Sequence, residues 1–197
     1  MTRDQQKKLK ELKTELPKII KEIAKEKKLK KKDYMLFSKK GELFFDCLIF
    51  LSVNDADECI CSTRETLKPM WLDDLLWELL DMKDNINAPI SLRAEGAFSI
   101  SGALLYDNKT ILVDWSKEEL QSIVEKYIIH FCDSITSADY SAFEDKLKDG
   151  YQNELRQALY YIHIGQFEKA LTVIGDEEGQ FSNGDLDINE AIRAYVR

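Results

Sequence analysis

Apolar residues near the N-terminus are spaced as on one face of a helix. They recur at steps of three and four residues: Leu9, Leu12, Leu16, Ile19, Ile20 and Ile23. Lysine and glutamate side chains occupy the opposite face. Pro17 lies inside the pattern and lacks the amide hydrogen of a helical bond, so the helix either kinks there or a second helix starts between Thr14 and Pro17. The pattern predicts a helix that ends near Leu29.

Three strand-like segments follow this helix, at residues 34–38, 43–53 and 58–66. The second is dense in phenylalanine, leucine, isoleucine and valine, and the third alternates in the way of a strand. Short polar stretches between the segments predict turns. Strands joined by short turns pair antiparallel, because parallel neighbours need long crossovers.

The pattern changes twice in the middle of the chain. Residues 69–82 carry a wide apolar stripe at helical spacing, and Pro69 suits the first turn of a helix. Strand character returns over residues 90–100 and 103–106. The dipeptide Asp107-Asn108 then predicts a hairpin turn into a further strand.

The next segment begins with Ser116 and has Glu119 three residues later, which predicts a helix with a capping box at its N-terminus. Its apolar face predicts a helix that runs to about Ile135. Beyond residue 137 the pattern is helical, with an acidic, glycine-containing loop over residues 175–184. A short closing helix is predicted over residues 187–197.

One helical pair resembles a tetratricopeptide hairpin. A helix over residues 151–164 ends at Gly165, an aromatic residue follows at Phe167, and the small residue Ala170 comes three positions later. The resemblance covers about 30 residues and occurs once, whereas a solenoid needs roughly three or more stacked repeats. It therefore implies a single α-helical hairpin in place of a repeat protein.

Together these elements predict an α+β fold. We expect an antiparallel sheet of five or six strands with an N-terminal helix and a packing helix, followed by a C-terminal α-helical hairpin. The pattern divides the chain into an α+β domain over residues 1–136 and a helical subdomain over residues 137–197.

Charge is distributed unevenly along the 197 residues, although the net charge is only −8. Residues 1–40 hold fifteen basic and six acidic side chains, and the remainder holds thirteen basic and thirty acidic ones. Such asymmetry is typical of an interaction arm, and it equally allows the basic helix to dock on its own acidic body. The N-terminus has no apolar signal-peptide core and no run reaches the ~20 apolar residues of a membrane span, so we expect a cytoplasmic protein that binds no membrane.

The residues able to do chemistry fit a structural interpretation. His130 and His163 are flanked by isoleucine and aromatic residues. Cys47, Cys59 and Cys61 have apolar neighbours, and free cysteine behaves as a small buried hydrophobe. Phosphate-binding glycine loops, serine-nucleophile elbows and paired zinc knuckles are missing from the sequence. We therefore expect no catalytic residues, no cofactor and no metal.

A protein-binding module without enzymatic activity is the function that the sequence favours. Its acidic surface suits a basic protein partner, by analogy of size and charge with small immunity- and adaptor-type proteins. Trp77 lies off the leucine stripe and is the best candidate for an exposed anchor, with packing in the core as the alternative. The candidate interface residues are Trp77, Lys28, Lys30, Lys31, Lys32, Tyr34, Asp176, Glu177 and Glu178.

Two alternative functions remain open. One is an enzyme with a carboxylate-lined pocket on a sheet face. The other, with less support, is nucleic-acid binding through the basic N-terminal segment, because lysines neutralise phosphates and Tyr34 can stack on a base. The acidic remainder of the chain would repel a polyanion. The sequence leaves the oligomeric state undetermined.

Overall fold

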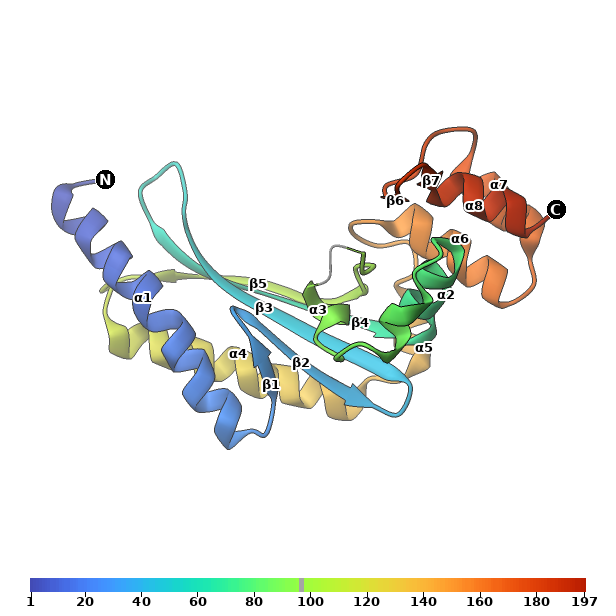
Figure 1. Cartoon of the computed structure of the whole chain (residues 1–197). Helices are drawn as coiled ribbons and strands as arrows, with labels where there is room; N and C mark the ends of the chain where they lie inside the picture. The colour runs from blue at the N-terminus through green and yellow to red at the C-terminus, as the bar shows by residue number, and fades with distance from the viewer. Residues whose placement is uncertain (96–97) are drawn as a thin grey trace. The chain divides into compact units, whose positions relative to one another are not determined.

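A five-stranded antiparallel sheet with the order β1-β2-β3-β4-β5 organises the chain, as Figure 1 shows. A computed structural model describes residues 1–95 and 98–197. The strands are β1 (Lys30–Lys32), β2 (Met35–Lys40), β3 (Leu43–Val53), β4 (Cys59–Pro69) and β5 (Ala103–Leu112). The predicted α+β class is confirmed, with five strands in the main sheet.

The chain divides into two units, and each is built from separated segments. Unit 1 consists of Met1–Lys40, Phe45–Thr66 and Leu104–Ala138. Unit 2 consists of Gly41–Phe44, Leu67–Ala103 and Asp139–Arg197. The division at residues 136 and 137 that the sequence suggests stays a prediction. Every helix in the described part of the chain is too short or too polar to cross a membrane.

The N-terminal helix of unit 1, α1 (Arg3–Glu26), is continuous through Pro17. Thr2 and Gln5 close a capping box at its start. The predicted apolar face is buried from Leu12 onward, since Leu12, Leu16, Ile19, Ile20 and Ile23 are all at most 7 % exposed, whereas Leu9 is half-buried. This face packs against α4 (Lys117–Ser137), beside which α1 lies in Figure 1. The basic helix is therefore docked within unit 1.

Helix α4 begins at the predicted serine but with a different partner for the glutamate. The Ser116 hydroxyl accepts a hydrogen bond from the Glu119 amide at 3.1 Å. The Glu119 carboxylate instead accepts the amides of Val113 and Asp114, at 2.8 and 2.9 Å. The capping interaction thus fixes the connection from β5 as well as the first turn of α4.

The predicted strand at residues 90–100 and the predicted hairpin after it are wrong. Helix α3 (Leu92–Glu95) occupies part of the first segment, and residues 96–97 lie outside the described residues. Asp107 and Asn108 continue β5 without a turn, because the neighbouring strand β4 pairs with this stretch and Arg64 on β4 lies 3.7 Å from the Asp107 carboxylate. Tertiary pairing has overridden the local turn preference.

Unit 2 is mainly helical. Its further helices are α2 (Trp71–Leu79), the 3₁₀ helix η1 (Lys83–Asn87), α5 (Tyr140–Asp145), α6 (Asn153–His163), α7 (Phe167–Ile174) and α8 (Ile188–Tyr195). Strands β6 (Ser182–Asn183) and β7 (Leu186–Asp187) form a small two-stranded sheet. Helices α6 and α7 pack together, and Gly165 between them has a φ of 73°, a conformation that favours glycine. The tetratricopeptide resemblance of this pair stays a prediction.

Candidate functional site

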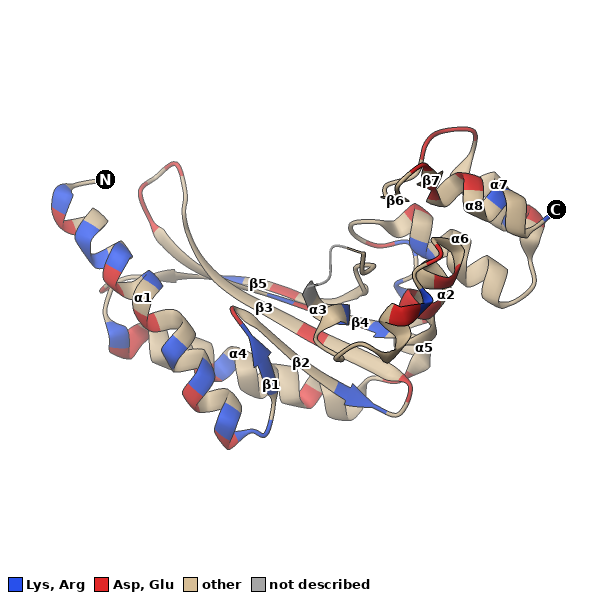
Figure 2. Ribbon diagram, viewed as in Figure 1, with Lys and Arg blue, Asp and Glu red and all other residues tan. Residues whose placement is uncertain are grey.

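The acidic residues predicted at the loop after α7 lie beside a hollow in unit 2. The hollow has a volume of about 150 Å³ and is lined by Glu154, Leu155, Ile174, Glu177, Glu178, Gly179, Gln180 and Asn189. Two of the three predicted acidic residues, Glu177 and Glu178, contribute to its wall. Asp176 is exposed next to them on the same loop. Figure 2 shows the acidic segment between α7 and β6.

Hydrogen bonds hold this acidic loop in place. The Arg193 guanidinium donates to the carbonyls of Gly175 and Glu177, both at 2.9 Å. The Asn189 side-chain amide donates to the Glu177 carbonyl at 3.2 Å, and the Gly179 amide donates to Asp187 at 2.8 Å. The loop therefore presents its glutamates from a fixed backbone, which lowers the entropy lost on binding.

Glu154 is the acidic residue of the hollow that the sequence did not indicate. It lies in the first turn of α6, twenty-three residues before Glu177 in the sequence. A first-turn glutamate is already explained by the helix dipole, so the sequence carried no separate signal. Only the packing of α6 beside the loop brings this third glutamate to the wall of the hollow.

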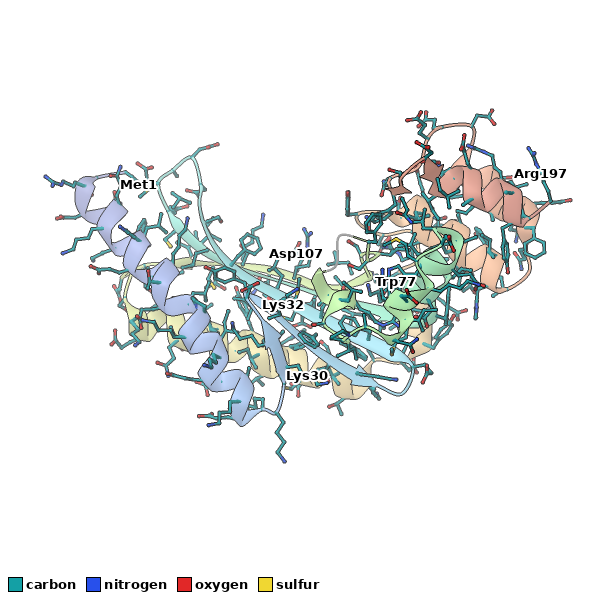
Figure 3. All side chains as sticks on the ribbon, in the orientation of Figure 1. Met1, Lys30, Lys32, Trp77, Asp107 and Arg197 are labelled. Atoms are coloured by element: carbon teal, nitrogen blue, oxygen red, sulfur yellow. The ribbon has the colours of Figure 1, made fainter. Side chains whose placement is uncertain are left out.

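Trp77 is not an exposed anchor. Its side chain is 1 % exposed, its indole nitrogen donates to the Phe98 carbonyl at 2.6 Å, and the Arg93 guanidinium carbon lies 4.7 Å from the ring centre. Figure 3 labels Trp77 among the side chains of α2 and its neighbours. The prediction was wrong because α2 is buried on more than its leucine stripe, so a position off that stripe is still inside unit 2.

A buried ion cluster surrounds the start of α2. The Lys68 ammonium lies 2.9 Å from the Asp73 carboxylate and donates to the carbonyls of Arg93 and Ile100 at 2.8 and 2.6 Å. Asp73 also accepts the Ile100 amide at 2.9 Å, and Arg93 reaches Asp74 at 2.5 Å. Lys68 and Asp73 are fully buried, and these bonds satisfy both. The cluster thus fixes the start of α2 inside unit 2.

The predicted basic residues lie together in unit 1, after α1. Lys28 follows the helix with a φ of 58°, and Lys30 and Lys32 are exposed on β1 with Lys31 half-buried between them. Tyr34 follows in the turn to β2 and is 39 % exposed. Figure 3 labels Lys30 and Lys32 on this strand. Lysines on a short edge strand also prevent unwanted strand pairing, so their clustering does not by itself identify a ligand.

A second polar cluster joins α4 to β4 in unit 1. The buried Glu65 carboxylate lies 2.9 Å from Nδ1 of His130 and accepts the Ser134 hydroxyl at 2.7 Å. The His130 ring stacks on Tyr106 with ring centres 3.8 Å apart, and its side chain is 44 % exposed. His130 is thus a partly exposed histidine held by a carboxylate.

Burial dominates the electrostatics of Glu65. Removal from water raises the pKa of its carboxyl, and the hydrogen bonds from Ser134 and His130 oppose that rise. A carboxylate that binds Nδ1 leaves Nε2 as the outward nitrogen, which is the arrangement used to orient an imidazole for proton transfer. The signal in the sequence was the i,i+4 spacing of His130 and Ser134 on α4.

The cysteines of the sheet are buried, as predicted. Cys47, Cys59 and Cys61 have no exposed surface. Burial raises the pKa of Cys59 to about 11 and that of Cys61 to about 12, and it raises the pKa of Cys47 further. Because the thiolate is the reactive form, these thiols are unreactive near neutral pH.

Comparison of the chain with protein-family models, with curated proteins and with solved structures found no match.

Proposed function

We propose that this chain is a protein-binding module in which unit 2 seats a cationic side chain of a basic partner. The observation that carries the proposal is the hollow lined by Glu154, Glu177 and Glu178. Three glutamates that line one concave surface make it acidic, which complements an ammonium or a guanidinium group. The fixed loop backbone described above supports the same conclusion.

The size of the hollow favours a side chain over a small-molecule substrate. Its volume of about 150 Å³ is below the roughly 300–1,000 Å³ of typical small-molecule pockets. Among the described residues, no group of three or more histidine, cysteine, aspartate or glutamate side chains is arranged to hold a metal ion. An organic cation is therefore the occupant that we propose.

The charge of unit 2 supports attraction of a basic partner over distance. Its segments contain nineteen acidic and nine basic residues, a net charge of −10, whereas those of unit 1 contain nineteen basic and seventeen acidic residues, a net charge of +2. A field of one sign accelerates encounter with an oppositely charged partner and is screened by salt. Association should accordingly slow as the salt concentration rises.

The test is a matched pair of triple variants. We expect E154Q/E177Q/E178Q to bind a labelled arginine-rich peptide at least about tenfold more weakly than the wild type, because the carboxylates of the hollow are lost. The control is D84N/D145N/E168Q, which removes three exposed charges elsewhere in unit 2. Fluorescence anisotropy at low and moderate salt measures both.

The control separates a site from a general field. It should weaken binding by about twofold or less, since it changes the net charge of unit 2 equally but leaves the hollow intact. Equal losses in the two triple variants would mean that the peptide responds to total charge alone. That result, or no binding by the wild type at low salt, would refute the proposed seat.

A further inference from the structure

Strand β5 forms an open edge of the main sheet. The strand order places β5 last, and no strand pairs with its outer side in residues 1–95 and 98–197. It is ten residues long, which corresponds to roughly 33 Å. A strand of this length presents a row of amide and carbonyl groups that another strand can pair with.

The two edges of the sheet differ in how they are protected. The opposite edge strand, β1, has three residues and all are lysines. Short length and lysine side chains are devices that prevent edge-to-edge pairing. On β5, by contrast, Ile111 is 47 % exposed, and Val113, which follows the strand, is 81 % exposed. The sheet is protected at β1, whereas β5 is a long edge that carries apolar side chains as well as the charged Asp107 and Lys109.

The sequence of β5 is complementary to itself when it is reversed about Asn108. Reversal places Asp107 opposite Lys109, Tyr106 opposite Thr110, Leu105 opposite Ile111 and Leu104 opposite Leu112. Each pair is either apolar or opposite in charge, apart from the tyrosine–threonine pair, which suits a sheet surface. Asn108 falls opposite itself.

The geometry of β5 is compatible with these pairs, because directly opposite residues of antiparallel strands share a face. Tyr106 and Thr110 both point toward α4, where Tyr106 stacks on His130 and Thr110 lies 2.7 Å from the Tyr127 hydroxyl. Asp107 belongs to the alternate set on the other face and pairs with Arg64 there. Figure 3 labels Asp107 on this strand.

We propose that β5 pairs with β5 of a second copy of this chain, antiparallel and with the two-fold axis at Asn108. The interface is isologous, as in most homodimers. Each Asp107 lies opposite Lys109 of the other copy, and each Leu105 lies opposite Ile111. The two five-stranded sheets then form one continuous sheet of ten strands.

Charge also selects the register. A register shift of two residues keeps each side chain on its own face of the sheet. Such a shift moves the two-fold axis by one residue along each strand. A centre at Asp107 would place Asp107 opposite itself, and a centre at Lys109 would place Lys109 opposite itself. Like charges directly opposite are destabilising. Of these three neighbouring registers, only the one centred at Asn108 pairs opposite charges.

A charge-swap series tests the dimer by analytical ultracentrifugation. We expect the wild type to sediment as a dimer at about 100 µM. Asp107→Lys and Lys109→Asp each place like charges opposite one another twice, so each should raise the dimer dissociation constant at least about tenfold. The double variant D107K/K109D restores opposite charges and should recover dimerisation. Both substituted positions are exposed in the single chain.

Disulfide trapping provides an independent test of the register. Cys132 on α4 is only half-buried and is removed first by the C132S substitution. In that background, Asn108→Cys should form a symmetric interchain disulfide on mild oxidation, because directly opposite strand residues have Cα atoms about 4.5–5.5 Å apart. Glu125→Cys, at an exposed position on α4, is the control and should not cross-link. A monomeric wild type, or failure of both the charge swap and the disulfide of the Asn108→Cys variant, would overturn the proposal.

Discussion

Lys68 is a charged residue in the interior of unit 2. Its ammonium is fully buried, contacts Asp73 and two carbonyls, and lies 5.6 Å from the Phe44 ring centre. Removal of water from a charge is costly unless its partners are complete. The stability of unit 2 therefore depends on the presence of both Lys68 and Asp73, so the two residues are best tested together.

We expect Lys68→Met to lower the free energy of unfolding by about 3–5 kcal/mol, because it leaves part of the Asp73 charge uncompensated in the interior. The double variant K68M/D73L should lose less than the sum of the single variants. Urea unfolding measures both. Lys83→Met, which breaks the exposed pair with Glu78, is the control and should leave the midpoint unchanged. Additive losses would contradict a coupled buried pair.

Arg156 is a second buried cation, and its burial cannot be predicted from the sequence. Its guanidinium is buried and donates to the carbonyls of Leu147, Asp149, Tyr151, Ser101 and Gly102. Burial lowers its pKa to about 10. In the sequence Arg156 is indistinguishable from a surface residue of a helix, since its acceptors are backbone groups that no residue type identifies.

Among the elements, α4 is joined to the sheet by polar contacts along one side. The Tyr127 hydroxyl donates to the Cys61 carbonyl at 3.0 Å, and His130 and Ser134 both contact Glu65 one turn and two turns further on. Such contacts fix the rotation of a helix that apolar packing alone leaves less defined. They also make the attachment of α4 dependent on pH.

Glu65 sets the sign of that pH dependence. Because burial raises its pKa above the ordinary value of 4.5, the folded state holds the proton to a higher pH than the unfolded state does. The stabilisation linked to this carboxyl is complete below the unfolded pKa and is lost as the pH rises through the folded pKa. We therefore expect Glu65→Gln to gain stability relative to its parent as the pH rises from about 4 to 8.

The comparison is best made in an H130N background, so that only the carboxyl of the cluster titrates. Urea unfolding of H130N and E65Q/H130N across the pH range gives the difference in unfolding free energy. Glu125→Gln, which changes an exposed carboxyl on the same helix, should show a difference that is independent of pH. A Glu65 difference that is flat with pH would show that its pKa is not raised by folding.

Sequence patterns predicted the elements whose signals are local and missed those decided by pairing. The apolar face of α1, the extent of β3 and the serine at the start of α4 follow from spacing and capping chemistry. Strand β1 was missed because three lysines have no strand preference, and its pairing with β2 decides the structure. The turn expected at Asp107 was overridden by pairing with β4.

The candidate site was predicted only in part. Glu177 and Glu178 were identified because acidic residues concentrate in a loop, and loops carry recognition residues more often than core elements do. Glu154 belongs to a different element, and no periodicity links it to the loop. Trp77 was misplaced because a helical stripe identifies the most buried face of a helix and does not show that the other faces are exposed.

At the scale of the whole molecule, the main feature is that the two units carry different charge. A net charge of −10 on unit 2 opposes its own compaction, whereas unit 1 is close to neutral. We expect a rise from about 0.02 to 0.5 M NaCl to slow amide hydrogen exchange in α6 more than in β3, because salt screens repulsion within unit 2. Mass spectrometry measures the exchange rates in the two elements, and sucrose serves as an uncharged control solute.

An equal response of both units to NaCl would indicate a general salt effect and contradict the role of unit 2 repulsion. Sucrose stabilises compact states without screening charge, so it should slow exchange in the two units alike. The two-solute comparison therefore isolates the electrostatic part.

The interleaved order of the two units has a consequence for synthesis of the chain. Unit 1 has all its segments once Ala138 has been made, whereas unit 2 waits for Asp139–Arg197. Until then the ribosome holds a chain whose α2 has no α6 or α8 to pack against, and its tryptophans and leucines are open to chaperones and proteases. A nascent chain that stalls after Ala138 would therefore contain all of unit 1, together with segments of unit 2 whose apolar side chains are still exposed. Cellular quality control removes species of this kind.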